Sequence, residues 1–199
     1  MTKGMKRVCD RLLTELEEKD KAREEMIRAS RIIVRKAGEA IACIVRGEDG
    51  SRQRSEAREA WSTLKRSLST HPDILYSGTV EGALEEYAEA EILASLIAGK
   101  EMVSHSELGI PPQSHICGFA DCIGELRRLA LQALDRSDPA LASKYLSLMC
   151  EMYDQLMRFD VPSSIAQVRR KQDVARALVE RTQGEVTLGK LMLGARKKR

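Results

Sequence analysis

Hydrophobic positions recur with the period of an α-helix along most of the chain. Near the N-terminus, Val8, Leu12 and Leu16 are four residues apart, and no proline interrupts the segment from about residue 3 to 47. Residues three and four apart lie on one face of a helix, so this pattern predicts a single long helix. At about 1.5 Å per residue it would extend over roughly 65 Å. That is long for a compact monomer of this size, so we expect an oligomer.

The same period, broken by turn and cap signals, divides the rest of the chain into further helices. We expect them over about residues 51–68, 81–99, 114–134, from Pro139 onward, and from about Pro162 to Gly184, with a short capped turn at Ser104–Glu107. The sequence has no alternating β-branched runs of the kind that form strands. It therefore predicts an all-α fold, an up-down helical bundle with a long N-terminal helix.

The domain organisation follows from length and composition. A chain of 199 residues with 43% apolar and 32% charged residues is long enough for one domain with a sizeable core. We expect this domain over residues 1–184 and a basic, flexible tail over residues 185–199, which ends in ARKKR. The net charge of +3 gives a weak overall field, so the placement of charges matters more than their sum.

The cysteines and apolar runs argue against secreted and membrane classes. Five cysteines occur without a CxxC pair, which favours reduced thiols over disulfides or a zinc site. The longest apolar run, residues 92–98, is too short to span a bilayer, and the N-terminal residues do not resemble a secretory signal. We expect a cytoplasmic protein that makes no contact with membranes.

The stretch from Glu81 to Gly99 contains five glutamates and no lysine or arginine. On a helix, Glu86 and Glu89 share a face that continues as Leu93, and a face that turns apolar is normally buried. Burying two carboxylates side by side is costly unless a proton, a cation or a metal compensates them.

A second pair of carboxylates, Asp121 and Glu125, lies on the helix predicted over residues 114–134. Taken alone, this pair fits a solvated face, with Glu125 paired to Arg128. The small residues Gly118 and Gly124 offer another interpretation, because they would let the helix that carries Glu86 and Glu89 approach closely. All four carboxylates would then converge.

Such a cluster would suit a hard divalent cation. Oxygen ligands without nearby His or Cys favour Mg²⁺ or Mn²⁺ over zinc, and the Glu-x-x-His motifs of di-iron bundles do not occur. A carboxylate-held Mg²⁺ can position water and stabilise developing charge in phosphodiester hydrolysis.

Basic residues form a stripe on the long first helix. Lys21, Arg28, Arg31 and Arg35 recur at intervals of seven, three and four, nearly opposite the apolar Ile33. From Lys21 to Lys36 there are six basic and two acidic residues. The stripe fits either a solvated face with local ion pairs or a surface that binds phosphates.

Two motifs resemble those of a known family. The combination of EYAEA, residues 86–90, and GFADCIGELRR, residues 118–128, in an all-helical chain of this length resembles the translin/Trax family. The similarity is greatest to the Trax-like (translin-associated factor X) branch. It extends to the first helix, with KAREEMIRASRIIVRKAGEAI, and to the last, with VRRKQDVARALVERTQG. The last helix departs from the family in ending with ERTQG, where a basic residue before the glycine is usual.

The resemblance implies a fold, an assembly and an activity. Members form octameric barrels of helical subunits that enclose RNA or DNA, so we expect a homo-octamer. Glu86, Glu89 and Asp121 match the catalytic carboxylates of a Mg²⁺-dependent endoribonuclease, and Glu125 lies in the matching GEL motif as a further metal ligand. RNA, single-stranded or in a short duplex, would be the partner, with its phosphates on Lys21, Arg28, Arg31 and Arg35.

An alternative from the same family stays open. The translin branch lacks the acidic set and binds nucleic acid without cutting it. The protein could then be a scaffold for single-stranded RNA or DNA whose carboxylates are structural or only regulate access.

Overall fold

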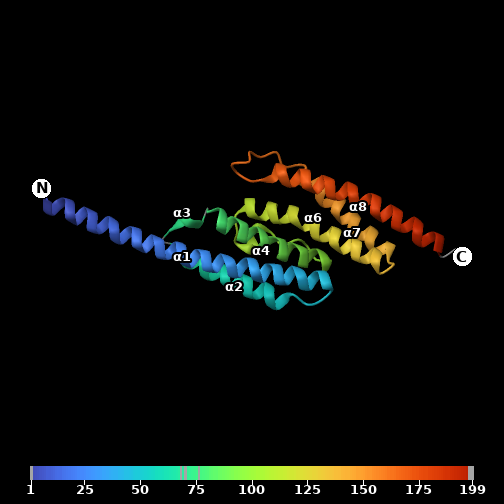
Figure 1. Ribbon diagram of the computed structural model, residues 1–199, viewed down its shortest axis with the longest axis horizontal. Coiled ribbons are helices and arrows are strands. Elements are labelled where there is room, and N and C mark those ends of the chain that lie inside the picture. Colours follow the sequence, from blue (N-terminus) through green and yellow to red (C-terminus); the bar gives the residue numbers. More distant parts are fainter. Residues whose placement is uncertain (1, 68, 70, 76, 197–199) are drawn as a thin grey trace.

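The computed structural model describes residues 2–67, 69, 71–75 and 77–196, and these fold into helices and connecting segments (Figure 1). No β-strand occurs among the described residues, which confirms the predicted all-α class. The helices are α1 (Thr2–Arg46), α2 (Ser51–Ser67), α3 (Pro72–Leu75), α4 (Gly78–Ile97), α5 (His105–Leu108), α6 (Pro112–Asp135), α7 (Pro139–Leu156) and α8 (Val168–Arg196).

The long helices form two groups of three that meet at α4 and α6. In the first group α2 returns along α1 and α4 runs forward again; in the second, α7 returns along α6 and α8 runs forward (Figure 1). The crossover that joins them contains α5, so α4 and α6 run in the same direction. The up-down order therefore holds within each group, and one crossover brings α4 of the first against α6 of the second.

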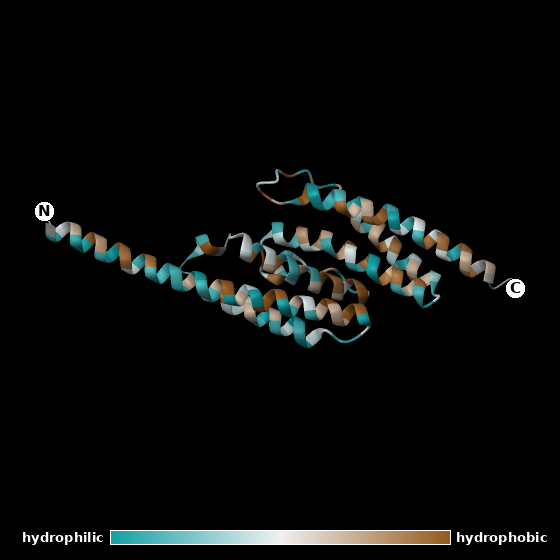
Figure 2. Cartoon of the chain, viewed as in Figure 1, coloured by the Kyte–Doolittle hydropathy of each residue, from teal (hydrophilic) through white to brown (hydrophobic). Residues whose placement is uncertain are grey.

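The first helix has two parts with different surroundings. From Met26 onward its predicted apolar stripe is buried in the bundle, with Ile33 and Ala37 fully covered. The N-terminal part projects beyond the other helices (Figure 1). Its apolar residues, visible as brown segments in Figure 2, are between 52% and 64% exposed: Met5, Val8, Leu12, Leu13 and Leu16. The projecting part thus carries an apolar face without a partner in the described chain.

Two predicted helix starts have the expected caps. Ser104 and Glu107 form a capping box, in which the Ser104 Oγ accepts from the Glu107 amide and the Glu107 carboxylate accepts from the Ser104 amide. At the start of α7, the Asp138 carboxylate accepts from the Leu141 amide at 2.9 Å, and Pro139 occupies the first helical turn. Such caps satisfy amides that have no partner within the helix.

The predicted start of the last helix near Pro162 is wrong. Residues 162–166 make only a turn, Ile165 is 61% exposed, and α8 begins at Val168. A long-range contact explains the delay. The buried Gln172 side chain donates to the backbone oxygens of Leu156 and Phe159, at 2.9 and 2.8 Å, and so ties the first turns of α8 to the end of α7.

The predicted end of that helix at Gly184 is also wrong, because α8 continues to Arg196. Val186 is buried against Ala133 and Ala142, so the helix still has an apolar face to bury beyond the glycine. Most of the expected flexible tail, residues 185–199, is therefore helical. Its last three residues, 197–199, lie outside the described chain.

Candidate functional site

Two pairs of carboxylates lie where the two groups of helices meet. Glu86 and Glu89 are on α4, and Asp121 and Glu125 are on α6. The helices are in close contact at Gly118, where an added Cβ would lie 2.4 Å from a backbone oxygen of α4. Only glycine allows this approach, because a side-chain carbon cannot come so close to a carbonyl oxygen. The predicted crossing of these two helices at small residues is confirmed.

Gly124 has a different neighbour from the one expected. An added Cβ there would be in ordinary contact, at 3.9 Å, with Leu178 of α8. Gly118 therefore brings α6 against α4, whereas Gly124 lies on the side of α6 that faces α8.

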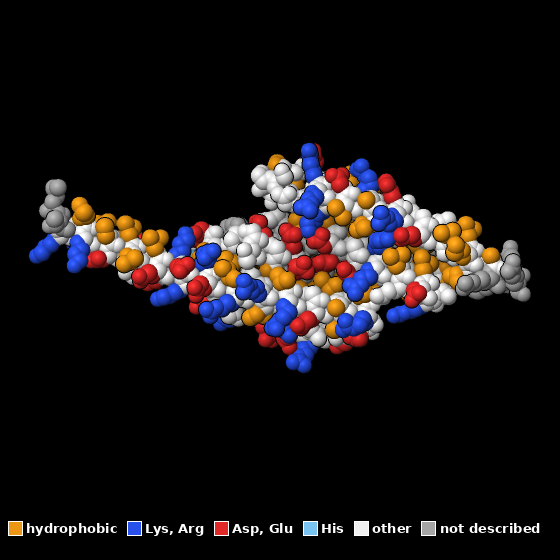
Figure 3. Space-filling model, in the orientation of Figure 1, with side chains coloured by type: hydrophobic (Ala, Val, Ile, Leu, Met, Phe, Trp, Pro, Cys, Tyr) orange, Lys and Arg blue, Asp and Glu red, His pale blue; other side chains and the backbone are white. Residues whose placement is uncertain are grey.

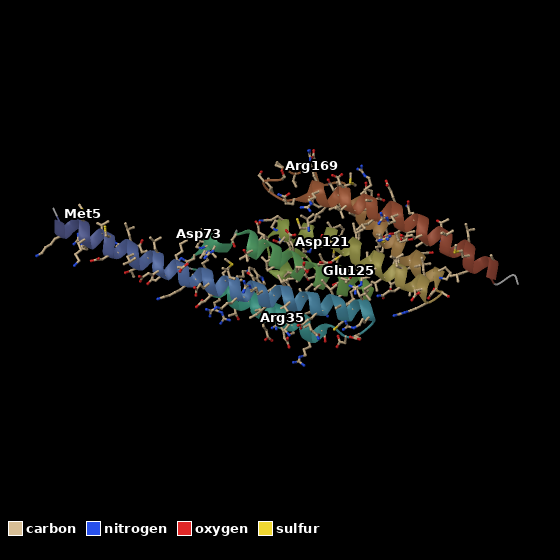
Figure 4. The ribbon with its side chains drawn as sticks, in the orientation of Figure 1. Met5, Arg35, Asp73, Asp121, Glu125 and Arg169 are labelled. Carbon is tan, nitrogen blue, oxygen red and sulfur yellow. The ribbon has the colours of Figure 1, made fainter. Side chains whose placement is uncertain are left out.

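A cleft of about 510 Å³ opens between α4, α6 and α8. Figure 3 shows the acidic side chains gathered in the middle of the visible face, with basic side chains on both sides. In Figure 4, Asp121 and Glu125 lie between α1, which carries Arg35, and the start of α8, which carries Arg169. One wall of the cleft is acidic and the other is mainly basic and apolar; the polar residues that line it are Glu85, Asp121, Gln167, Arg170 and Lys171.

The carboxylates are close enough to affect one another's protonation. Glu89 is only 8% exposed, and burial raises the pKa of its carboxyl to about 8, with further contributions from the charges of Asp121, Glu86 and Glu125. Burial, followed by the charge of Asp121, also raises the pKa of the half-buried Glu86. The structure thus brings together the four carboxylates that the sequence singled out, and Glu89 holds a proton at neutral pH.

Lys171 of α8 is the cation that the sequence analysis missed. Its ammonium donates to Asp121 Oδ2 at 2.5 Å and to Glu85 Oε2 at 3.0 Å. Burial lowers the pKa of Lys171, but the hydrogen bonds and charges of Asp121 and Glu85 together outweigh burial and raise the pKa above its ordinary value. Glu85, next to Glu86 on α4, was likewise not among the predicted site residues.

The sequence carries a signal for Lys171. It lies three residues after Val168 and four before Ala175, both of which are buried. Those spacings place it on the apolar face of α8, where a lysine needs a partner for its charge. That partner could not be named from the sequence, because it is 50 residues away on α6.

The donor set fits a hard divalent cation, although the side chains are not arranged as ligands. No three His, Cys, Asp or Glu side chains of the described residues are grouped as a metal site. The cluster nevertheless holds more negative charge than its two cations balance: Lys171 pairs with Asp121, and Arg128 pairs with Glu125 at 3.4 Å. In the described chain the Glu89 carboxyl has neither a hydrogen bond nor an ion pair. Carboxylate oxygens favour Mg²⁺ or Mn²⁺. The metal site stays a prediction.

Glu91 serves a different purpose from the other glutamates of α4. Its side chain is 4% exposed and pairs with Arg54 at 2.7 Å and with Arg58 at 2.9 Å, both on α2. Arg58 also donates to the Tyr87 hydroxyl at 3.3 Å. These contacts hold α4 from the side of α2 and leave its other side for the cleft.

The basic stripe on α1 lies on the surface and outside the cleft. Lys21, Arg28, Arg31 and Arg35 are all exposed, and Arg28 makes only a loose pair with Glu24, at 3.6 Å. Arg31 and Arg35 line a separate groove of about 410 Å³ beside the start of α4. The structure does not bring the stripe into contact with the carboxylates, and its role in binding stays a prediction.

No helix among the described residues is long and apolar enough to cross a membrane.

Comparison with known proteins places the chain in a family. A family model described as the translin family matches residues 21–186. The uncharacterised protein MJ0175 of Methanocaldococcus jannaschii is 33% identical over 178 residues, which cover 88% of this chain and 79% of that protein.

Two solved structures share the fold. The structure of AfC3PO in complex with duplex RNA has a TM-score of 0.85 and 30% identity, and the match covers 92% of this chain and 97% of that one. The structure of apo-NeC3PO has a TM-score of 0.82 at 20% identity, over 91% of this chain and 96% of that one, and so supports the fold alone. On the family match and the similarity to the archaeal protein, the chain belongs to the translin family.

Proposed function

We propose that this protein is a Mg²⁺-dependent endoribonuclease of the Trax-like branch, which binds RNA inside an oligomeric shell and hydrolyses its phosphodiester bonds. One observation carries the proposal: α4 and α6 bring Glu86, Glu89, Asp121 and Glu125 close enough to affect one another's charge, and Asp121 of this cluster lines the cleft between α4, α6 and α8. Buried like charges cost free energy, and binding a cation is the function that best offsets this cost.

The four carboxylates have distinct parts in this proposal. Glu86, Glu89 and Asp121 are the catalytic carboxylates that hold Mg²⁺ or Mn²⁺, and Glu125 is a further ligand. When bound, the cation supplies positive charge that stabilises the negative charge developing on the phosphate. Glu89 must release its proton before its oxygens can ligate the cation, because carboxylate ligands are deprotonated. Metal affinity is therefore expected to increase with pH.

RNA as the substrate is supported by the AfC3PO structure, which is described as a complex with duplex RNA and covers 92% of this chain. We extend this ligand class to the present protein, as single-stranded RNA or a short duplex, with single-stranded DNA as a further ligand. The exposed arginines of α1 and the basic wall of the cleft supply positive charge on both sides of the acidic cluster (Figure 3). Such charge binds phosphates without reading sequence.

Assembly into a shell, most plausibly an octamer, is supported by exposed apolar surface at both ends of the chain. The projecting part of α1 exposes Leu12 and Leu16, and the far part of α8 exposes Leu188, Leu191 and Met192. Contiguous exposed apolar surface commonly marks an interface between proteins. The five free cysteines fit the proposed cytoplasmic location.

The test is cleavage of end-labelled RNA, single-stranded and as a short duplex, in Mg²⁺, in Mn²⁺ and in EDTA. We expect cleavage with either cation and none in EDTA. RNA that is bound but stays intact in all three conditions would identify the protein as a non-catalytic RNA- or DNA-binding scaffold. Absence of both binding and cleavage would contradict either function.

The basic stripe gives a separate prediction on binding. Replacing Arg28, Arg31 and Arg35 by alanine should weaken RNA binding and reduce the slope of log affinity against log salt by about 0.7 for each phosphate that the variant no longer binds. Fluorescence anisotropy with labelled RNA over a range of salt concentrations measures both quantities.

The control for the stripe is an equal loss of charge elsewhere on the same helix. Arg7, Arg11 and Arg23 are also exposed on α1, and their replacement by alanine changes the net charge by the same amount. If the two triple variants bind RNA equally well, the stripe is an ordinary solvated face.

A further inference from the structure

Lys171 lies at the point where a cation would be held by Asp121. Its ammonium already contacts one Asp121 oxygen, at 2.5 Å, and one Glu85 oxygen, at 3.0 Å. The lysine side chain is 20% exposed, and it comes from α8 rather than from either helix that carries the carboxylates. Within the described residues it is the one Lys or Arg that makes an ion pair with any of Glu86, Glu89 and Asp121.

This contact helps explain why the carboxylates converge without forming a ligand set. Asp121 is directed to the lysine on α8, whereas Glu86 and Glu89 face the cluster without a cation of their own. Ligation through Asp121 Oδ2 therefore requires the Lys171 ammonium to leave that oxygen.

We propose that Lys171 is a positioning residue of the metal site, whose ammonium holds Asp121 in the absence of a divalent cation and is displaced when the cation binds. The displaced ammonium remains in the cleft beside Arg170, on the wall opposite the carboxylates, where it is free to contact a substrate phosphate. The inference rests on the proposed function, because it assumes that the carboxylates bind a metal ion.

Electrostatics and geometry both allow the exchange. A divalent cation carries twice the charge of the ammonium and is attracted by several carboxylates at once, so it competes effectively for Asp121. The lysine has a flexible four-carbon stem, so its ammonium can move while the backbone of α8 stays in place. The cleft of about 510 Å³ leaves room for this movement.

The experiment is a titration of the metal-free protein with Mn²⁺ alone, measured by isothermal titration calorimetry, for the parent and for Lys171→Met. The variant keeps an unbranched side chain but removes the charge that competes for Asp121. We expect it to bind Mn²⁺ more tightly, on the order of fivefold, the factor expected for removal of a competing ion pair of ordinary strength. Its thermal midpoint in EDTA should be lower than that of the parent, because the carboxylates are left without their counter-charge. Saturating Mn²⁺ should raise the midpoint of the variant by more than it raises the midpoint of the parent.

The second readout is cleavage at saturating Mn²⁺. We expect slower cleavage in Lys171→Met despite its tighter metal binding, because the ammonium that would bind the phosphate is absent. If Lys171→Met cleaves RNA at the parent rate, the proposed contact between Lys171 and the substrate phosphate is wrong. The proposed competition between Lys171 and the cation for Asp121 is not affected by that result.

Arg127→Met is the matched control. Arg127 also links α6 to α8, through Glu185 at 2.6 Å and Thr182 at 2.7 Å, but it does not line the cleft. This variant should be destabilised equally with and without Mn²⁺ and keep the parent affinity. Lys171→Gln, a second neutral variant, replaces Lys171→Met if the latter does not fold.

The outcomes separate this inference from the proposed function. If the parent binds Mn²⁺ and the neutral Lys171 variants bind it no more tightly, the proposed role of Lys171 is overturned while the metal site stands. If neither the parent nor the variants bind Mn²⁺, the proposed metal site is wrong, and so is the proposed competition between Lys171 and the cation for Asp121. Binding by the variants but not by the parent is the strongest support, because the lysine then excludes the cation.

Discussion

Glu89→Gln should reduce the rate of RNA cleavage by about a hundredfold or more without lowering the stability of the protein. Glutamine keeps the shape of the side chain but cannot give up a proton to become a charged ligand. Glu89 is almost fully buried beside Glu86, Asp121 and Glu125, and its carboxyl must take up a proton when the protein folds at neutral pH. Glutamine is already neutral, so it avoids this cost and leaves no buried partner without its charge. Labelled-RNA cleavage and thermal unfolding in EDTA measure the two effects.

The pH dependence of stability tests whether the protonation of Glu89 accounts for the effect of Glu89→Gln on stability. The pKa of Glu89 is about 8 in the folded protein, against 4.5 for the ordinary carboxyl, so folding takes up a proton between these values. The contribution of Glu89 to stability is therefore fully present below pH 4.5 and is lost as pH rises to about 8. Glutamine does not titrate, so the stability of Glu89→Gln relative to the parent should increase over this window.

The exposed carboxylate Glu59 provides the control. Glu59→Gln should cleave RNA at the parent rate and show the parent dependence of stability on pH. A Glu89→Gln variant that still cleaves RNA would place the catalytic site elsewhere, and an unchanged pH profile would mean that Glu89 is ionised in the folded protein.

Variants of the other two catalytic carboxylates should differ from each other in thermal stability, although both should be inactive. Glu86→Gln and Asp121→Asn should both stop cleavage. In the described chain the Glu86 carboxylate has no ion pair, so its replacement should leave the thermal midpoint level or raise it, whereas Asp121→Asn weakens the contact with Lys171 and should lower it. The sequence does not show this difference, because the partner of Asp121 lies on a distant helix.

Gly118→Ala should destabilise the protein and disrupt the carboxylate cluster together. The added Cβ would lie 2.4 Å from the Glu85 backbone oxygen and 2.8 Å from the Ala88 Cβ and the Glu89 amide nitrogen. Backbone atoms cannot rotate away as a long side chain can, so α4 and α6 must separate. Overpacking of this kind costs about 1–3 kcal/mol, or roughly 5 °C in thermal midpoint for a chain of this size. Because the separation also moves Glu86 and Glu89 away from Asp121, cleavage should decrease strongly.

Gly38→Ala is the matched control for this change. Gly38 also lies inside a helix, α1, but an added Cβ there meets nothing within 4 Å. Alanine favours helix over glycine by about 1 kcal/mol, so this variant should be as stable as the parent or more stable. Equal midpoints for the two variants would show that α4 and α6 are not in close contact.

Local patterns determined much of the architecture. The apolar period is a property of the helix itself, so it indicated the main helices, and capping depends on residues a few positions apart, so Ser104, Glu107 and Asp138 marked two helix starts correctly. The face shared by Glu86 and Glu89, together with glycine at position 118, was enough to predict that two helices cross and bring four carboxylates together.

The features that depend on distant contacts were decided only by the tertiary structure. The start of α8 depends on Gln172 binding carbonyls at the end of α7, and its extension past Gly184 depends on Val186 packing on Ala133 and Ala142. Lys171 interrupts an apolar face, which shows in the sequence, but its contact with Asp121 arises only when α8 packs beside α6. Helix periodicity reports which side of a helix is buried and not which helix covers it. The cation beside the carboxylates therefore became visible only once the helices were in place.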